Sequence, residues 1–246
     1  MQLLRNIPGV LPQPCVATIG FFDGVHRGHR YLIEQVREVA VAHGFASGVV
    51  TFPVHPRKVV QPEYHPELLT TYEEKVALLA ETGLDYCMML DFTPEVAILS
   101  AKEFMLFLYN HYNIRALVIG YDHRFGHNRS EGFDDYVRYG QELGIEVILA
   151  HAYIDKDVAV SSSVIRQLLS EGNVSEAASC LGYDYFLNGI VVSGYRVGRK
   201  IGFPTANLRV DDPDKLVPSD GVYAVRVTVA GQLWWYAQYW LSSYNG

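Results

Sequence analysis

The stretch VATIGFFDGVHRGHRYLIEQVREVA, residues 16–40, decides the fold of the first part of this chain. Residues 16–19 form an apolar run that predicts a buried strand. Apolar side chains then recur at helical spacing from Tyr31 to Val39, and Gly44 predicts the end of that helix. The segment between them, GFFDGVHRGHR at 20–30, is therefore a glycine-rich turn that leads from a strand into a helix N-terminus.

Strand-like and helix-like patterns alternate along the chain up to about residue 150. Apolar runs predict further strands at 48–52, 86–90, 116–119 and 147–149. Helical spacing predicts helices at 73–79 and 101–109. This alternation predicts an α/β fold, in which a parallel sheet is covered by helices on both faces.

The character of the sequence changes near residue 182, after a predicted helical stretch at 161–181. The residues beyond it alternate as β-strands do, for example at 222–229. They are also rich in turn residues, among them Gly189, Gly194, Gly198, Gly202, Pro204 and Pro218. We therefore expect two domains, at residues 1–183 and 184–246, of which the second is β-rich.

Composition excludes several classes of protein. The 246 residues carry a formal net charge of −7, and 49% are hydrophobic against 19% charged, which excludes a disordered chain. Because the charges are not gathered in blocks, we expect neither a nucleic-acid nor a membrane partner. Cys15, Cys87 and Cys180 are odd in number and far apart, which excludes a disulfide scaffold or a zinc ribbon and favours the reducing cytoplasm. The first residues lack the long apolar run of a signal peptide.

The turn at 20–30 has the features of a phosphate-binding site. The unpaired amides of a first helical turn and the helix dipole attract anions, and Gly20, Gly24 and Gly28 let a phosphate approach the backbone. His26 and His29 can each donate an N–H to a phosphate oxygen, and a protonated ring adds charge. A metal-binding histidine pair and a purely structural turn remain as alternatives. The glycine spacing matches neither the dinucleotide fingerprint nor a Walker loop, which disfavours a dehydrogenase or a P-loop kinase.

Three further polar segments belong with this turn. TFPVHPR at 51–57 and GYDHRFGHNR at 120–129 follow predicted strands, and open α/β sheets bind ligands at that end of their strands. SSSVIR at 161–166 begins with hydroxyls suited to helix capping, and Arg166 can present its planar guanidinium to a phosphate. Each segment alone is explained as well by a polar loop over a sheet edge. Together the four segments predict one ligand site on the rim of the sheet.

These motifs resemble those of a known family. H-x-G-H after a first strand is the signature of the nucleotidylyltransferases. The longer string GFFDGVHRGH, followed in order by TFPVHPR, GYDHRFG and SSSVIR, resembles the FMN adenylyltransferase half of bacterial bifunctional riboflavin kinase/FAD synthetases. GYRVGRKIGFPTANL at 194–208 and GVYAVRV at 221–227 resemble the riboflavin kinase half. The resemblance extends from about residue 14 to residue 232.

The resemblance implies a Rossmann-like nucleotidylyltransferase domain that makes FAD from FMN and ATP with magnesium, followed by an incomplete β-barrel of the riboflavin kinase type. It implies that His26, His29 and Arg166 are catalytic. The implied ATP-binding residues are Gly20, Phe21, Phe22, Asp23, Gly24, His26, Gly28, His29, Ser162 and Arg166. The implied flavin-binding residues are His55, Pro56, Asp122, Arg124 and Phe125. The FMN phosphate is the nucleophile and is already ionised at pH 7, so no general base is expected.

In the second half, the resemblance implies that Gly198 and Gly202 belong to a phosphate-binding loop. It also implies that Thr205 and Asn207 supply oxygens to a magnesium ion on ATP, with riboflavin as the substrate phosphorylated. The barrel of the family continues further and includes a later Glu that acts as base on the riboflavin hydroxyl. Residues 227–246 contain no charged side chain. We therefore expect the riboflavin kinase activity of this chain to be lost or weak.

The last residues depart from the family's pattern, since they read WWYAQYWLSSYNG at 234–246. Trp has the single codon TGG, so Trp234 and Trp235 give two glycines when they are read one base later. Permitted codons for the remaining residues give GGMLNIGYRPTT, which restores the pattern of the family. We therefore expect residues 234–246 to be out of frame.

Two other functions remain compatible with the motifs. One is a catalytically silent flavin- or nucleotide-binding protein. The other is a nucleotidylyltransferase that uses a different phosphate acceptor, although such enzymes lack the half of the chain that contains PTAN. The oligomeric state has no signature in the sequence.

Overall fold

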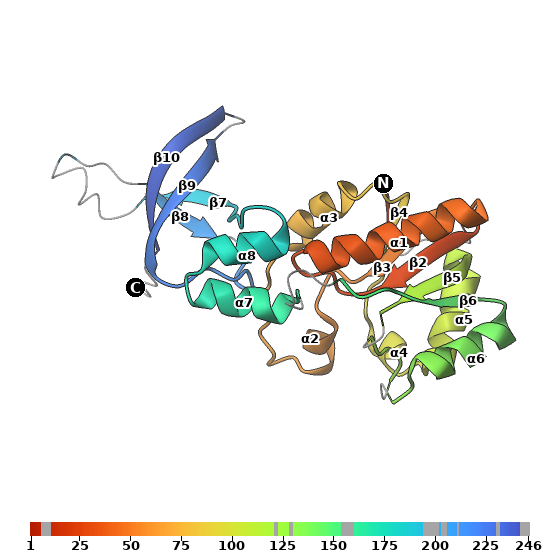
Figure 1. Cartoon of the computed structure of the whole chain (residues 1–246). Coiled ribbons are helices and arrows are strands. Elements are labelled where there is room, and N and C mark those ends of the chain that lie inside the picture. The colour runs from red at the N-terminus through yellow and green to blue at the C-terminus, as the bar shows by residue number, and fades with distance from the viewer. Residues whose placement is uncertain are drawn as a thin grey trace. The chain divides into compact units, whose positions relative to one another are not determined.

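A computed structural model of the chain describes residues 1–5, 11–120, 123–127, 130–153, 160–193, 202, 206–210, 212–229 and 232–241. The chain forms two compact units, Met1–Ser161 and Ser162–Gly246 (Figure 1). Each unit has its own secondary structure. The division at 183/184 expected from the sequence remains a prediction about two functional domains.

The first unit is built on a six-stranded sheet in which all neighbouring strands are parallel. Its strands are β1 (Gln2–Arg5), β2 (Cys15–Ile19), β3 (Ala46–Thr51), β4 (Tyr86–Met89), β5 (Ile114–Ile119) and β6 (Glu146–Leu149), in the spatial order β1-β4-β3-β2-β5-β6. The α/β fold predicted from the alternating patterns is confirmed. The order reverses direction at β2, and such a switch point is where open α/β sheets bind ligands.

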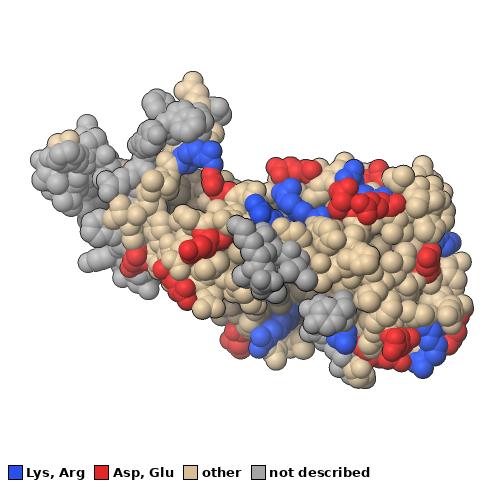
Figure 2. Space-filling view, viewed as in Figure 1, with Lys and Arg blue, Asp and Glu red and all other residues tan. Residues whose placement is uncertain are grey.

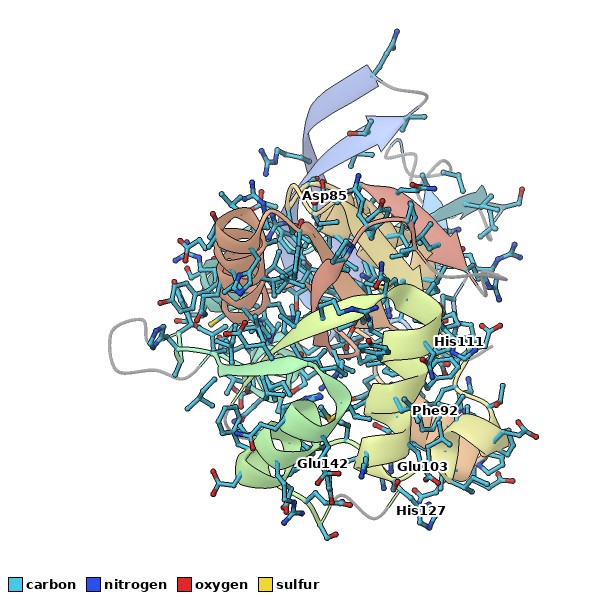
Figure 3. All side chains as sticks on the ribbon, turned by 90° about the vertical axis from the view of Figure 1, so that its right-hand side faces the viewer. Asp85, Phe92, Glu103, His111, His127 and Glu142 are labelled. Carbon is cyan, nitrogen blue, oxygen red and sulfur yellow. The ribbon has the colours of Figure 1, made fainter. Side chains whose placement is uncertain are left out.

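Helices cover both faces of this sheet (Figure 1). They are α1 (Arg27–His43), α2 (Pro56–Val60), α3 (Tyr72–Ala80), α4 (Pro94–Ala97), α5 (Ala101–Tyr112) and α6 (Phe133–Leu143). The buried side of α1 packs on β2 and β3. On the opposite face, alternate residues of β2 such as Ala17 and Ile19 join a core cluster with Phe104 and Leu108 of α5 and Tyr136 of α6. Figure 3 shows α5, which carries Glu103 and His111, beside α6, which carries Glu142.

The second unit contains two helices and two antiparallel strand pairs. Its elements are α7 (Ser162–Ser170), α8 (Val174–Leu181), β7 (Gly189–Val192), β8 (Asn207–Val210), β9 (Gly221–Val229) and β10 (Gln232–Leu241). β7 pairs with β8, and β9 pairs with β10. The single helical stretch expected at 161–181 is divided in two, because Gly172 adopts a left-handed φ of 80° between α7 and α8.

Four elements of the first unit were not predicted from the sequence: β1, α2, α4 and α6. β1 is four residues long at the edge of the sheet, and only Leu4 of it is buried, so it has no apolar pattern. α6 contains Gly140, a weak helix former that packing requires, because a Cβ there would lie 2.3 Å from the carbonyl oxygen of Ile145. The helix propensity of its residues alone therefore does not predict α6.

Charge and hydropathy of the described residues agree with the composition. On the face shown in Figure 2, the positive and negative side chains of the described residues are interspersed. Among the helices that the structure describes, none is both long enough and apolar enough to cross a membrane.

Candidate functional site

Three of the four predicted ligand segments start at the same edge of the first unit's sheet. β2, β3 and β5 are parallel neighbours, so the chain leaves all three at one edge, at Gly20, Phe52 and Gly120 respectively. The rings of Phe21 and His55 meet edge to face, with their centroids 4.7 Å apart. The structure therefore brings the turn after β2 and the segment after β3 into contact, as the sequence predicts.

The turn after β2 has an unusual backbone. Gly24 has a left-handed φ of 80°, and so do two residues with bulky side chains, Phe22 at 55° and Val25 at 36°. Aromatic and β-branched residues rarely adopt this region, and they keep it only where surrounding contacts enforce it. Gly20 is required for a different reason: a Cβ there would lie 3.0 Å from the ring of Phe22.

The buried carboxylate of Asp23 connects this turn to residues 69 and 70. Asp23 is 3% exposed and accepts hydrogen bonds from the N–H groups of Leu69 and Thr70, each at 3.0 Å, and from the Thr70 hydroxyl at 3.1 Å. The N–H of Gly24 donates to the same hydroxyl oxygen at 3.1 Å. Asp23 therefore anchors the turn to residues 69 and 70, and the ATP contact implied by the resemblance remains a prediction.

His26 and His29 come together at the start of α1. Their rings stack with centroids 3.6 Å apart and planes 16° apart. His26 is the N-cap of α1, and its Nδ1 accepts a hydrogen bond from the backbone N–H of His29 at 3.3 Å. Gly28 makes room for the His26 ring, since a Cβ at position 28 would lie 3.2 Å from Cε1 and Nδ1 of His26. Because the rings stack and one nitrogen is used by the backbone, the arrangement is unlike a pair of ligands aimed at one metal ion.

His29 is held in its neutral form. Burial lowers the pKa of His29 well below its usual value of 6.5, and the neighbouring His26 and the Lys75 ammonium lower it further. Its Nδ1 is buried without a hydrogen-bond partner among the described residues, and its ring also meets that of Phe22 at 5.1 Å. His29 can therefore offer an N–H donor near pH 7, without the positive charge considered from the sequence.

We predict opposite titration behaviour for two histidines of the same helix. His43 is exposed, and its bonds to the Val39 carbonyl and the Glu146 carboxylate raise its pKa above 6.5. The imidazole signals of His29 should stay constant over roughly pH 6 to 8 in NMR spectra, while those of His43 titrate. Because the pKa of His29 is lower in the folded protein than in the unfolded one, the unfolded protein binds a proton more readily below pH 6.5. The free energy of unfolding should therefore decrease as the pH falls below 6.5. A His29 signal that titrates near 6.5 would contradict this environment.

Lys75 of α3 was missed in the sequence and lies directly behind the turn. Its side chain is 2% exposed, and its Nζ donates to the carbonyl oxygens of Phe21 at 3.1 Å and Phe52 at 2.7 Å. The same ammonium lies 3.9 Å from the centroid of the Phe21 ring. The sequence does contain a pattern that indicates its burial: at helical spacing, Lys75 lies on the same face of α3 as the buried Leu78 and Leu79.

His55 and Pro56 of the predicted flavin set begin helix α2. His55 is its N-cap and accepts a bond from the N–H of Arg57 at 3.1 Å, and Pro56 occupies the first helical position. The ring of Tyr64 lies 5.5 Å from that of His55, and the guanidinium of Arg57 lies 4.3 Å over the Tyr64 ring. The half-buried His55 therefore belongs to an aromatic cluster that starts at Phe21.

The segment after β5 divides between the rim and the core. Arg124 is half-buried, and its guanidinium donates to the His123 carbonyl. Phe125 is 8% exposed and its ring stacks on that of Tyr136 at 4.1 Å, and the flavin contact implied by the resemblance remains a prediction. The N–H of His127, labelled in Figure 3, donates to the Leu99 carbonyl at 2.8 Å, which fixes this segment next to α5. Asp122, also assigned to the flavin, lies outside the described residues.

The remaining predicted residues belong to the second unit. Ser162 begins α7, and Arg166 lies half-buried on the same helix. Gly202 has a left-handed φ of 85°, as a loop glycine can. Asn207 begins β8 with an exposed side chain. Gly198 and Thr205 lie outside the described residues. Within the ranges that the structure describes, no cluster of three or more His, Cys, Asp or Glu side chains is arranged to hold a metal ion.

Comparisons with protein families divide the chain in two. The FAD synthetase family profile matches residues 10–164, and the riboflavin kinase family profile matches residues 181–243. The first match covers the parallel sheet with its rim, and the second covers β7 to β10.

Curated relatives match across both halves. The bifunctional riboflavin kinase/FMN adenylyltransferase of Escherichia coli (strain K12) is 36% identical over 236 residues, which is 94% of this chain and 75% of that protein. The protein of the same name from Listeria monocytogenes is 35% identical over 218 residues, with 88% of this chain and 69% of that protein covered. The one from Bacillus subtilis (strain 168) is 33% identical over 220 residues, with 89% and 69% covered.

A solved structure also matches. It is described as the crystal structure of a macrolide-efflux protein from Streptococcus pneumoniae, and it matches with a TM-score of 0.83 at 32% sequence identity. The match covers 95% of this chain and 77% of that one. The arrangement of elements seen here is therefore shared with an experimental structure.

Proposed function

The chain belongs to the family of bifunctional riboflavin kinase/FMN adenylyltransferases, and on that premise we propose that it transfers AMP from ATP to FMN, with release of pyrophosphate. The observation that carries the proposal is the coincidence of the FAD synthetase match at 10–164 with the His26–His29 pair at the start of α1. The fold alone would not specify the reaction, because this type of sheet serves many chemistries.

The proposed reaction is a single displacement at phosphorus. An oxygen of the FMN phosphate forms a bond to the α-phosphorus of ATP, the bond from that phosphorus to the bridging oxygen breaks, and pyrophosphate leaves with the electron pair. The FMN phosphate is ionised at pH 7, so the protein has to position two anions and stabilise charge as it moves to the leaving group. The first turn of α1, which contains no acidic side chain, and the neutral His29 ring provide N–H donors for this purpose.

Other residues receive their roles from the family. Ser162 and Arg166 would bind the phosphates that leave as pyrophosphate, since a hydroxyl and a guanidinium suit phosphate oxygens. Arg124, Asp122 and His55 would contact FMN. Magnesium, when bound, would neutralise phosphate charge, and it would be held mainly by the phosphates themselves.

Product analysis tests the proposal and separates it from the two other functions. The purified 246-residue chain is incubated with ATP, magnesium and FMN, and the flavins are separated by chromatography. We expect FAD, formed in step with pyrophosphate. A silent binder would leave FMN unchanged, and an enzyme with another acceptor would consume ATP only when that acceptor replaces FMN.

For the second half, we propose that Thr205 and Asn207 would hold magnesium on ATP, as their oxygen atoms suit a hard cation. Residues 227–246 contain no carboxylate side chain, so they supply no base for the riboflavin hydroxyl. We predict that a polypeptide of these 246 residues converts riboflavin to FMN weakly or not at all, while it still converts FMN to FAD. The same assay with riboflavin in place of FMN measures this, and robust FMN formation would contradict it.

A further inference from the structure

Lys75 is a buried cation that the proposed chemistry does not use. It lies on α3, which is separate from the four predicted ligand segments, and its side chain is 2% exposed. A lysine is almost never buried without specific partners, because removing an ammonium from water is costly. The groups that accept hydrogen bonds from Lys75 therefore indicate its role.

The ammonium of Lys75 donates hydrogen bonds to two different predicted substrate segments. Nζ donates at 3.1 Å to the carbonyl oxygen of Phe21, in the predicted ATP-binding turn after β2. It donates at 2.7 Å to the carbonyl oxygen of Phe52, in the segment after β3 that leads to His55. One ammonium thus joins the backbones of both segments where they leave the sheet.

The side chain of Phe21 reinforces this connection. Its ring has the Lys75 ammonium 3.9 Å from its centroid, and it also makes the edge-to-face contact with the His55 ring at 4.7 Å. The Phe21 carbonyl accepts a second bond, from the Thr51 hydroxyl at 3.1 Å. Burial lowers the pKa of Lys75 to about 8, while the Asp23 carboxylate and Cys87 oppose the shift. The cation therefore sits among groups that hold the turn in its strained shape.

We propose that Lys75 is a positioning residue for the adenylyl transfer: its ammonium fixes the predicted ATP-binding turn relative to the predicted flavin-binding segment. The inference rests on the proposed function for its catalytic consequence. An apolar side chain of similar length would fill the same space but would leave two carbonyl oxygens without this donor. Lys75 touches no reacting atom in this account and acts only through the backbones of Phe21 and Phe52.

The test compares three variants of the full chain. Lys75→Met keeps the length and removes the donors and the charge, and Lys75→Gln keeps amide donors without the charge. Lys102→Met is the matched control, because Lys102 is an exposed lysine of α5 that forms an ion pair with Glu142. Hydrogen exchange of the backbone amides at 20–26 and at 54, 55, 57 and 58, measured without substrate, reports on the connection independently of activity.

For Lys75→Met we expect exchange to accelerate at least about tenfold in both segments together while the helices α5 and α6 stay protected. The kcat for FAD formation should fall about tenfold to a hundredfold, because small misplacements of bound reactants are costly. Lys75→Gln should lie between the wild type and Lys75→Met, and Lys102→Met should match the wild type. If Lys75→Met does not fold, the same exchange comparison is made with Lys75→Gln.

Two results would overturn the inference. One is exchange that is unchanged, or that accelerates in only one of the two segments. The other is a folded Lys75→Met protein with kcat and both KM values within about twofold of the wild type, since a positioning role predicts a larger loss. A wild-type chain that forms no FAD would instead overturn the proposed function, and the exchange data would still decide whether Lys75 connects the two segments.

Discussion

Replacement of His29 by alanine is expected to lower the rate of FAD formation roughly tenfold to a thousandfold, because a lost transition-state donor costs about 1.4–4 kcal/mol. His29 is the better of the two histidines to replace, since its Nδ1 has no partner among the described residues. His26 also caps α1, so its removal would combine a loss of chemistry with a loss of helix stability.

His43→Ala is the matched control for this experiment. It removes a histidine from the last turn of the same helix, far along α1 from the turn at 20–26. Initial rates at saturating ATP and FMN should be unchanged in His43→Ala and strongly reduced in His29→Ala. A His29→Ala protein that has the melting temperature of the wild type and makes FAD at the wild-type rate would contradict the proposed role of His29 as a donor to phosphate.

Replacement of Asp23 by alanine is expected to lower the free energy of unfolding by roughly 2–6 kcal/mol. The change leaves the buried N–H groups of Leu69 and Thr70 without their acceptor, and each such group costs about 1–3 kcal/mol. The strained backbone at Phe22 and Val25 also loses the contact that enforces it, so FAD formation should fall even where the protein remains folded.

Urea unfolding measures this effect, with Asp134→Ala as the control. Asp134 is an exposed residue of α6, and its removal should change the unfolding free energy by no more than about 0.5 kcal/mol. If Asp23→Ala unfolds within about 1 kcal/mol of the wild type with an unchanged m-value, the anchoring role is wrong.

Strands β2 to β6 of the first unit were predictable because each contains a short apolar run. β2 and β3 are buried along their whole length, and parallel strands covered on both faces need such runs. β1 and α6 were not predictable in this way. The edge strand β1 depends on its pairing with β4, and α6 depends on a close approach between Gly140 and Ile145. Both are consequences of packing that a local pattern does not contain.

The candidate site was predictable where its residues lie close to one another in the sequence. His26, Gly28 and His29 lie within four positions, and their arrangement at a helix N-terminus follows from the strand-turn-helix pattern. The roles of Asp23 and Lys75 were not predictable from neighbours, because their partners lie elsewhere in the chain. Asp23 bonds to Leu69 and Thr70, and Lys75 bonds to Phe21 and Phe52. The stacking of Phe125 on Tyr136 was likewise not predictable from its motif, and its assignment to the flavin remains a prediction.

Adenylyl transfer to FMN is measured most directly by following the α-phosphate of ATP. The full chain is incubated with FMN, magnesium and ATP labelled at the α-phosphate, and label is traced in the flavin, nucleotide and protein fractions. We predict that the label appears in FAD, with one pyrophosphate released for each FAD formed and no label bound covalently to the protein. Label that stays in ATP, or that is released as AMP while FMN remains unchanged, would contradict it.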